Sequence, residues 1–255
     1  MSVTITKHTE AICILTIDHP PVNSLDQATS LALTEAVGEA SATPEVRVII
    51  ITGKGKCFVA GADLNELAAW DGRTASSEGG QTRTAFAALR HSPKAVIAAI
   101  NGPAMGGGLE LALSCDIRVA AEKAILGLPE VKLGVLPGAG GTQLLPRLIG
   151  LGRALEMMTT GRSVSAKEAL ALGLIDQLAG DNALDKAISL AEQIAANAPL
   201  AVAGIKAAAY AALSLPLADG LNKESEEFAK LCDTEDKNTG VAAFKARQKA
   251  IFAGR

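Results

Sequence analysis

Aromatic side chains are scarce in this sequence and make up only 3% of its 255 residues. The apolar core must therefore be built from Ala, Leu, Val and Ile, and few rings are left for stacking on the bases of single-stranded nucleic acid. Basic residues are not in excess either, because the formal net charge is −3. Since a phosphate-binding surface is basic, we expect no nucleic-acid partner.

The sequence also lacks paired cysteines and long apolar runs. Cys13, Cys57, Cys115 and Cys232 are scattered with no C-x-x-C pair, so we expect small core residues in a reducing compartment. No apolar run approaches the roughly 18 residues that span a membrane. The first residues alternate like a strand and lack the basic and apolar regions of a signal peptide. These features predict a cytoplasmic protein with no membrane partner.

Motifs for nucleotides, metals and a serine nucleophile are missing. The segment GAGGTQ at 138–143 begins like a dinucleotide fingerprint, but it ends in Gln143 and follows a predicted loop rather than a strand. There is no G-x-S-x-G elbow and no H-E-x-x-H, and the three histidines are dispersed. Metal, nicotinamide and serine-nucleophile chemistry are all disfavoured.

Strands and helices alternate over the first 135 residues. The patterns predict a strand or hairpin at 3–18, a helix at about 27–40 and strands at 46–53, 95–100, 116–122 and 124–130, with short helices after residues 62 and 107. VRVIIITG is dominated by a run of β-branched residues and AVIAAI is continuously apolar, as in strands buried on both faces. This alternation is typical of an α/β fold.

From Gly141 onward the segments indicate helices. They include a capping box at Ser165–Glu168, a long apolar-periodic stretch at 183–213 and a last helix over 236–252. No low-complexity linker separates the two parts, so we expect the helical part to pack on or beside the α/β core.

Two segments share the order of buried strand, glycine turn and helix start: FVAGADLNEL at 58–67 and NGPAMGGGLEL at 101–111. A helix N-terminus leaves backbone N–H groups without partners, and glycines allow a ligand to approach them. Two such ends facing one point would form an oxyanion hole, in which one donor contributes roughly 2.7–4 kcal/mol to a transition state. The alternative is two ordinary helix starts with glycines for tight packing.

Glu110 and Glu130 are the candidate acid and base groups. Glu110 lies in the first turn after Gly108, and Glu130 follows a proline at a predicted strand end. Paired carboxylates in an apolar cavity can perform acid–base work without histidine, because burial raises a glutamate pKa. Each could instead be a solvated surface carboxylate, and the spacing alone does not bring them together.

The chain resembles the crotonase superfamily, and within it the enoyl-CoA hydratases. The resemblance runs nearly end to end and is carried by HPPVNSL, CFVAGADLNEL, the long block from KAVIAAINGPAMGGGLELALSCD to GVLPGAGGTQLLPRLIG, TGRSVSAKEALALGLID and GVAAFKARQKAIF. It implies a spiral of ββα units over residues 1–195, with the active site. Residues 196–255 would be a C-terminal helical region for trimerisation and active-site cover.

The resemblance also implies roles for single residues. The backbone N–H groups of Ala62 and Gly107 would bind the thioester carbonyl, and Glu110 and Glu130 would be the catalytic pair. Gly138 would lie near the reacting water and the acyl group. Residues implied to line the wall beside the coenzyme A are Ala60, Gly61, Asp63 and Leu64.

Three residues of the C-terminal region match positions that contact the nucleotide end of coenzyme A: Phe228, Phe244 and Arg247. Phe244 also fits a simple core aromatic at helical spacing. The segment 70–84 matches no family motif, so the resemblance implies no residue roles there, although the segment lies where this family shapes the acyl pocket.

The implied activity is the hydration of a 2-enoyl-CoA to a 3-hydroxyacyl-CoA, as in β-oxidation, by a homo-trimer or hexamer. No cofactor is implied, since the substrate itself carries coenzyme A. Family members that only isomerise double bonds typically keep the position of Glu130 and lose that of Glu110, so the pair favours hydration. The alternatives are an enoyl-CoA isomerase, a hydratase of a branched or aromatic acyl-CoA, and a scaffold that binds coenzyme A or RNA without turnover.

Overall fold

A six-stranded, mostly parallel sheet forms the centre of the computed structural model, which describes residues 2–77 and 79–255. Only the first pair of strands is antiparallel, so the predicted N-terminal hairpin is confirmed. Ile50 lies opposite Ile14 on one side and Ile97 on the other. In spatial order the strands are β1 (Val3–Thr9), β2 (Ile12–Ile17), β3 (Val48–Gly53), β4 (Ala95–Ile100), β6 (Ile117–Ala121) and β9 (Gln177–Ala179).

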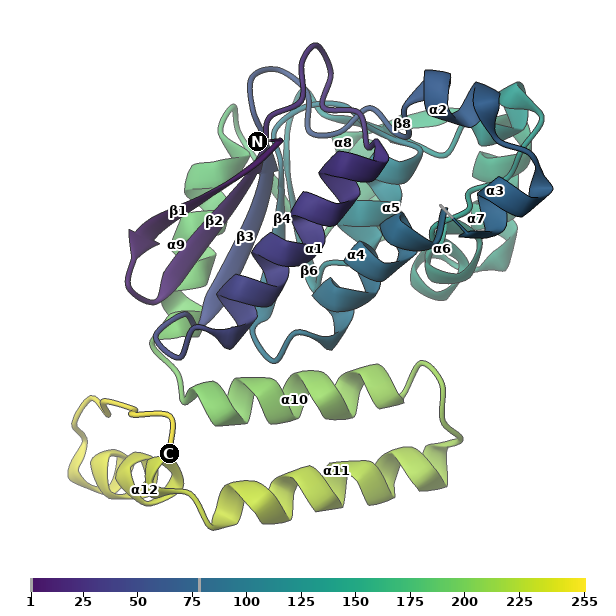
Figure 1. Cartoon of the computed structure of the whole chain (residues 1–255). Coiled ribbons are helices and arrows are strands. Elements are labelled where there is room, and N and C mark those ends of the chain that lie inside the picture. The colour runs from purple at the N-terminus through teal and green to yellow at the C-terminus, as the bar shows by residue number, and fades with distance from the viewer. Residues whose placement is uncertain (1, 78) are drawn as a thin grey trace.

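Helices cover both faces of this sheet, which explains the continuous apolar runs of its central strands. Every residue of β3 and β4 is buried. In Figure 1, helices α1 (Gln27–Ala42) and α4 (Gly79–His91) lie on one face, and α9 (Ala183–Ala195) lies on the other. Two apolar clusters, one on each face, follow from this arrangement.

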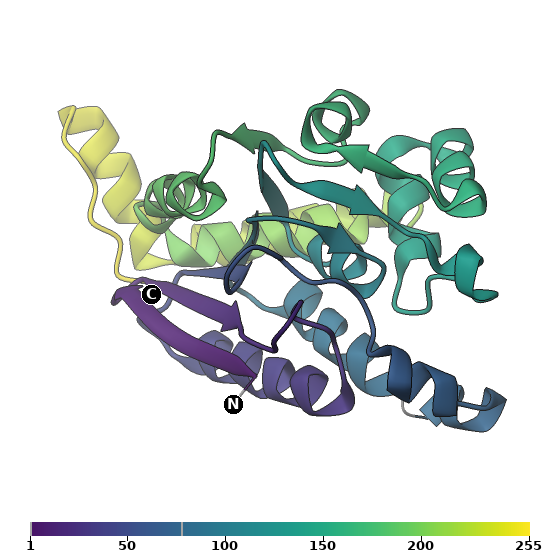
Figure 2. The same ribbon diagram turned by 90° about the horizontal axis from the view of Figure 1, so that it is seen from above.

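A small sheet and several short helices complete the spiral. A small three-stranded sheet contains β5 (Ala104–Met105), β7 (Ile125–Gly127) and β8 (Ser163–Ser165). Figures 1 and 2 show α2 and α3 on the same side as α6 and α7 and remote from the C-terminus. The bounds are α2 (Leu64–Ala69), α3 (Gly72–Ser77), α5 (Gly107–Leu113), the 3₁₀ helix η1 (Glu130–Leu133), α6 (Gly141–Ile149), α7 (Leu151–Thr160) and α8 (Ala166–Leu172).

Three helices form the C-terminal part: α10 (Pro199–Ala211), α11 (Leu217–Cys232) and α12 (Glu235–Ala246). Figure 1 shows α10 and α11 side by side along one edge of the spiral. The prediction of a last helix over 236–252 is wrong in its final turns, because Arg247 ends α12 with a φ of 55°. The chain then turns back, and the N–H groups of Ala253 and Gly254 donate to the Asp236 carboxylate at 2.7 and 2.8 Å.

The helical prediction for 183–213 is confirmed, while the prediction of helices alone from Gly141 onward needs correction. The apolar-periodic stretch at 183–213 is two helices, α9 and α10, bent by 107°. The break precedes Pro199, which starts α10 and holds Ala198 in an extended conformation. Strands β8 and β9 also lie in the part predicted to be helical. Within the described ranges, no single helix has the length and apolar character to cross a membrane, and α9 and α10 meet that criterion only as a bent pair.

The capping box is half formed. Ser165 Oγ accepts the N–H of Glu168 at 3.2 Å, as predicted. The Glu168 carboxylate does not reach back to Ser165, because it pairs with Arg162 at 2.7 Å.

Candidate active site

The loop that carries Ala62 is held by hydrogen bonds on both sides of that residue. Leu25 donates its N–H to the Gly61 carbonyl at 2.8 Å and accepts the N–H of Asp63 at 3.1 Å. Successive N–H groups of an extended chain point to opposite sides, so the N–H of Ala62 faces away from Leu25. Within the described part of the chain, this N–H donates to no protein acceptor.

A second free donor lies next to the first. Gly107 is the first residue of α5, so its N–H has no acceptor in the helix, and none elsewhere among the residues described. A Cβ placed on Gly107 would lie 3.7 Å from the backbone nitrogen of Ala62. A Cβ on Gly108 would lie 2.0 Å from the Val59 carbonyl oxygen, so only glycine lets α5 approach the Ala62 loop this closely. The two predicted segments therefore meet, and they place two unengaged N–H groups together.

Leu25 belongs to the loop of residues 19–26, whose own hydrogen bonds hold it and with it the direction of the Ala62 N–H. Asn23 is 3% exposed and has a φ of 58°. Its amide donates to the carbonyls of Cys57 at 2.9 Å and Phe58 at 3.2 Å, immediately before the Ala62 loop. His19 Nδ1 lies 2.9 Å from the Ser24 carbonyl oxygen and closes the loop from its other end.

Glu110 projects from α5 and is 3% exposed, so its interpretation as a solvated surface carboxylate is wrong. Its Oε1 accepts the N–H groups of Ala139 and Gly141, both at 2.8 Å, at the N-terminus of α6. Burial raises the pKa of Glu110, while these two donors act against the rise because they favour the ionised carboxylate.

Glu130 stands at the start of η1 in a different environment. Its Oε2 is buried, with no hydrogen-bond partner in the described ranges. Burial raises the pKa of Glu130 to about 7; its own backbone N–H opposes this rise, and the nearby charge of Glu110 adds to it. Glu110 and Glu130 line the same cavity, which their spacing in the sequence could not establish. A Cβ on Gly106, the residue before α5, would lie 3.1 Å from Glu130 Oε1.

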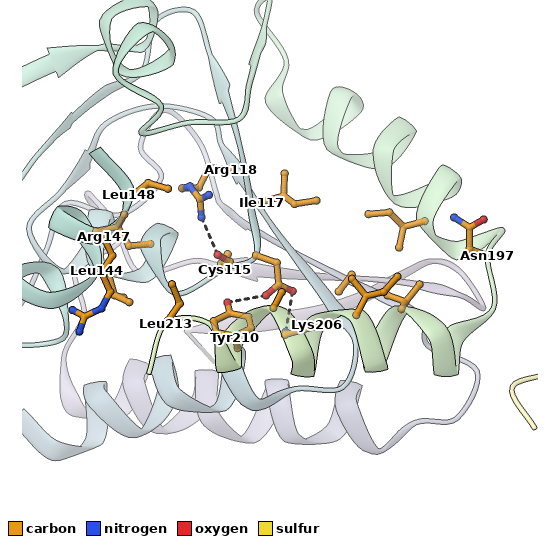
Figure 3. Close-up of a pocket in the computed structure, with 17 residues that line it drawn as sticks. Cys115, Ile117, Arg118, Leu144, Arg147, Leu148, Asn197, Lys206, Tyr210 and Leu213 are labelled. Atoms are coloured by element: carbon orange, nitrogen blue, oxygen red, sulfur yellow. Dashed lines mark hydrogen bonds and ion pairs between the residues drawn. The ribbon is translucent and has the colours of Figure 1, made fainter. Parts of the chain in front are cut away.

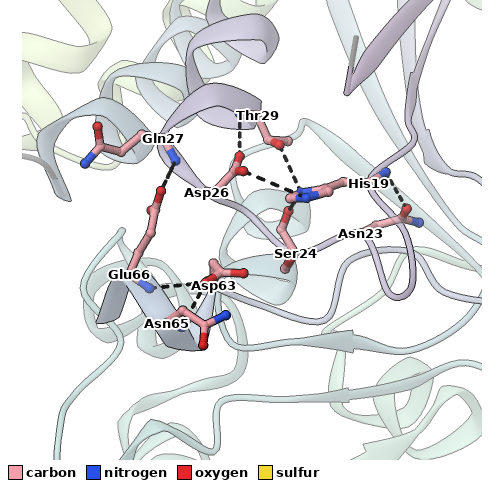
Figure 4. Close-up of polar contacts among 9 residues, drawn as sticks. All are labelled: His19, Asn23, Ser24, Asp26, Gln27, Thr29, Asp63, Asn65 and Glu66. Atoms are coloured by element: carbon pink, nitrogen blue, oxygen red, sulfur yellow. Dashed lines mark hydrogen bonds and ion pairs between the residues drawn. The ribbon is translucent and has the colours of Figure 1, made fainter. Parts of the chain in front are cut away.

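Ala62, Gly107 and the two glutamates line one cavity of about 600 Å³. The predicted residues that the structure brings together there are Ala60, Gly61, Ala62, Asp63, Leu64, Gly107, Glu110, Glu130 and Gly138. Asp63 also caps α2 by accepting the N–H groups of Asn65 and Glu66 (Figure 4).

Sequence reasoning missed several groups of this site. Ala139 and Gly141 hold Glu110, and the glycine-rich run GAGG was a signal that a backbone approaches another group closely there. Trp70, Thr82 and Arg83 line the cavity from the segment 70–84, which carried no motif. Residue 78 of that segment lies outside the described residues.

The three predicted nucleotide contacts do not line this cavity in the single chain. Phe228 on α11 is 68% exposed and lies in a separate groove between α10 and α11. Phe244 on α12 is 87% exposed, so its interpretation as a core aromatic is wrong. Arg247 follows α12 and is exposed as well.

A second polar cluster, beside α10, joins the C-terminal helices to the spiral (Figure 3). Lys206 Nζ lies 2.9 Å from the Asp116 carboxylate and donates to the carbonyls of Leu89 and Lys94. Tyr210 donates its hydroxyl to Asp116 at 2.8 Å, and burial, followed by the Asp116 charge, raises the tyrosine pKa. Since these groups satisfy one another, the cluster stabilises the position of α10.

The fold and the cavity together define a class of protein. It is an α/β spiral in which two free backbone donors, one buried carboxylate and one half-buried carboxylate share a cavity. The sequence profile of the enoyl-CoA hydratase/isomerase family matches residues 7–255. The chain belongs to this family, as the resemblance of its motifs predicted.

Similar proteins agree in sequence and in fold. The 2,3-dehydroadipyl-CoA hydratase of Escherichia coli is 38% identical over 257 residues, which cover all of both chains. The crotonyl-CoA hydratase of Syntrophomonas wolfei is 37% identical and covers 96% of each chain. The crystal structure of an enoyl-CoA hydratase from Bacillus anthracis superposes with a TM-score of 0.96 at 39% identity, covering both chains entirely. The predicted crotonase fold is thereby confirmed.

Proposed function

We propose that the protein adds water across the 2,3 double bond of a 2-enoyl-CoA to give a 3-hydroxyacyl-CoA. One observation carries this proposal: two unengaged backbone N–H groups, the buried Glu110 and the half-buried Glu130 line the same cavity. Family membership and the names of relatives support it.

The two N–H groups would act on the thioester carbonyl. As water adds to the β carbon, negative charge develops on the carbonyl oxygen, and donors fixed in advance stabilise that charge. Ala62 is held by Leu25 and Gly107 by the start of α5, so neither donor has to reorganise during the reaction.

The environments of the glutamates favour different protonation states. Two N–H donors favour the ionised form of Glu110, which suits the group that orients the water and accepts its proton. Glu130 has an unpartnered Oε2 and a pKa of about 7, which suits the group that delivers a proton to the α carbon. The hydroxyl group of the water would go to the β carbon and its other proton to Glu110, while the proton of Glu130 would go to the α carbon. Return of one proton from Glu110 to Glu130 through solvent would restore the starting state.

The test is the disappearance of the conjugated enoyl-thioester absorbance with crotonyl-CoA. Wild type should consume the signal, and Glu110→Gln should slow it by a factor of about 10² to 10⁴. The same variant is also tested for isomerisation of a 3-enoyl-CoA. An isomerase should keep this activity, because it acts through Glu130, whereas a hydratase loses its main activity when Glu110 is replaced. A wild type that only isomerises would refute the proposal.

The relatives' names cover more than one acyl group, from crotonyl to 2,3-dehydroadipyl. We therefore propose a 2-enoyl-CoA as the substrate class, with coenzyme A carried by the substrate and no separate cofactor.

We also propose that the chain assembles as a homo-trimer or hexamer through residues 196–255. Large apolar side chains are exposed on α10 and α11 of the single chain, including Ile205 at 69% and Leu217 at 80%. Phe228, Phe244 and Arg247 would then contact the nucleotide of a substrate bound in a neighbouring copy. Light scattering measures the assembly, and a monodisperse monomer would contradict it.

A further inference from the structure

Arg83 is the one Lys, Arg or His side chain among the described residues that line the cavity. The other ionisable groups of the lining are the carboxylates of Asp63, Glu66, Glu110 and Glu130. Asp63 caps α2, and Glu66 accepts the N–H of Gln27 at 3.2 Å (Figure 4). These acids have internal partners or belong to the catalytic pair, whereas the Arg83 side chain is exposed.

The guanidinium of Arg83 is anchored at one end only. Its Nη2 donates to the Ser76 carbonyl at 3.1 Å, and no carboxylate of the described residues forms an ion pair with it. Since a guanidinium has five N–H donors, most of them remain available to a ligand.

The surroundings of Arg83 combine this cation with an aromatic surface. A Cβ on Gly79 would lie 3.4 Å from Arg83 Nη1 and 3.8 Å from the ring of Trp70, so both groups border the space that the glycine leaves open. Thr82, also on the lining, bonds through its hydroxyl to Ser30 at 2.9 Å and ties this part of α4 to α1.

A guanidinium of this kind recognises carboxylates and phosphates, because its fork of N–H groups matches two oxygens. An acyl-CoA offers both: the phosphates of coenzyme A and, in some substrates, a carboxylate on the acyl chain. The indole favours the second source, since it suits the methylenes of an acyl chain better than a fully hydrated diphosphate.

We propose that Arg83 binds a carboxylate at the far end of the acyl chain, so that the preferred substrates are dicarboxylic enoyl-CoA thioesters. This inference rests on the proposed function for its site, but its test does not depend on turnover. Saturated thioesters cannot be hydrated, so their binding isolates the role of Arg83.

The experiment is calorimetric titration of the full-length protein with pairs of saturated thioesters of five, six and eight carbons. Each pair compares an acyl-CoA with the matching ω-carboxyacyl-CoA, and free coenzyme A is titrated separately. Wild type should bind the carboxylated member about tenfold or more tightly for at least one length, as expected for a charge-assisted hydrogen bond. Arg83→Met should bring that ratio close to one, and Arg83→Lys should restore part of it.

A matched control is Arg73→Met, which removes a guanidinium from the adjacent α3 outside the cavity lining. It should keep the wild-type ratio. The proposal is overturned if wild type shows no preference at any of the three lengths. It is also overturned if Arg83→Met weakens free coenzyme A as much as the carboxylated thioesters, because the guanidinium then binds a phosphate.

Discussion

Replacing Glu130 by glutamine should lower the hydration activity, and it should remove a loss of folding stability that wild type suffers above neutral pH. Because its pKa is raised from 4.5 to about 7, the folded protein holds this proton more tightly than the unfolded chain does. Its contribution to stability is fully present below pH 4.5 and is lost as the pH rises through 7. At about 1.36 kcal/mol per pKa unit the loss is about 3 kcal/mol, and solvent in the open cavity reduces it to about 2 kcal/mol.

Glu130→Gln lacks this loss, since an amide does not ionise. Urea unfolding followed by circular dichroism, at pH 5 and pH 8 and one protein concentration, gives the free energy of unfolding of wild type and variant. The free energy of unfolding of the variant minus that of wild type should increase by about 1 to 2 kcal/mol from pH 5 to pH 8. The hydration activity of the variant should be lower than that of wild type. The exposed Glu35→Gln on α1 is the matched control and should show no such change. A pH-independent difference for Glu130→Gln would refute the reasoning.

Three further predictions follow from the contacts of the site. A methyl group at Gly141 would lie 2.7 Å from Pro137 Cβ and 3.1 Å from Glu110 Oε1. Gly141→Ala should therefore lower the free energy of unfolding by about 1–3 kcal/mol and reduce the hydration activity. Urea unfolding and the crotonyl-CoA assay measure these two effects, and a variant unchanged in both would contradict the prediction. Asn23→Gly keeps the positive φ but removes the amide behind the Ala62 loop, so kcat should fall by about tenfold or more. Asn182→Gly, at the start of α9, is its control, and an equal loss there would contradict the positioning role of Asn23. The pH profile of kcat/KM should decline on its alkaline side near the Glu130 pKa of about 7, and a profile flat to pH 9 would exclude Glu130 as the acid.

Local patterns predicted the elements that are long or strongly apolar. The runs of β3 and β4 identify buried parallel strands, and α1 begins at Gln27, where the pattern placed it. Strands β8 and β9 have three residues each, too few for any alternation to show. The end of α12 is fixed by the returning tail on Asp236, a contact between residues 17 and 18 positions apart that a helical pattern does not contain.

The sequence predicted individual groups of the site but not their arrangement in space. The glycine turns at 58–67 and 101–111 indicated two donors, and Glu110 and Glu130 were the evident carboxylates. That they share a cavity depends on the approach of α5 to Val59 and of α6 to Glu110, which are tertiary contacts. No sequence motif marks Arg83, because its proposed role depends on the side chains that surround it in the folded chain. Phe228, Phe244 and Arg247 do not line the cavity of the single chain, so their contact with the nucleotide of coenzyme A stays a prediction.

The most direct test of the central claim is mass analysis of the product formed from crotonyl-CoA in water labelled with heavy oxygen. Hydration by the two glutamates predicts a 3-hydroxyacyl-CoA that carries one labelled oxygen at the β carbon. Its formation should be slowed by orders of magnitude in both Glu110→Gln and Glu130→Gln. Wild type that forms no labelled product, or variants that form it at the wild-type rate, would contradict the account.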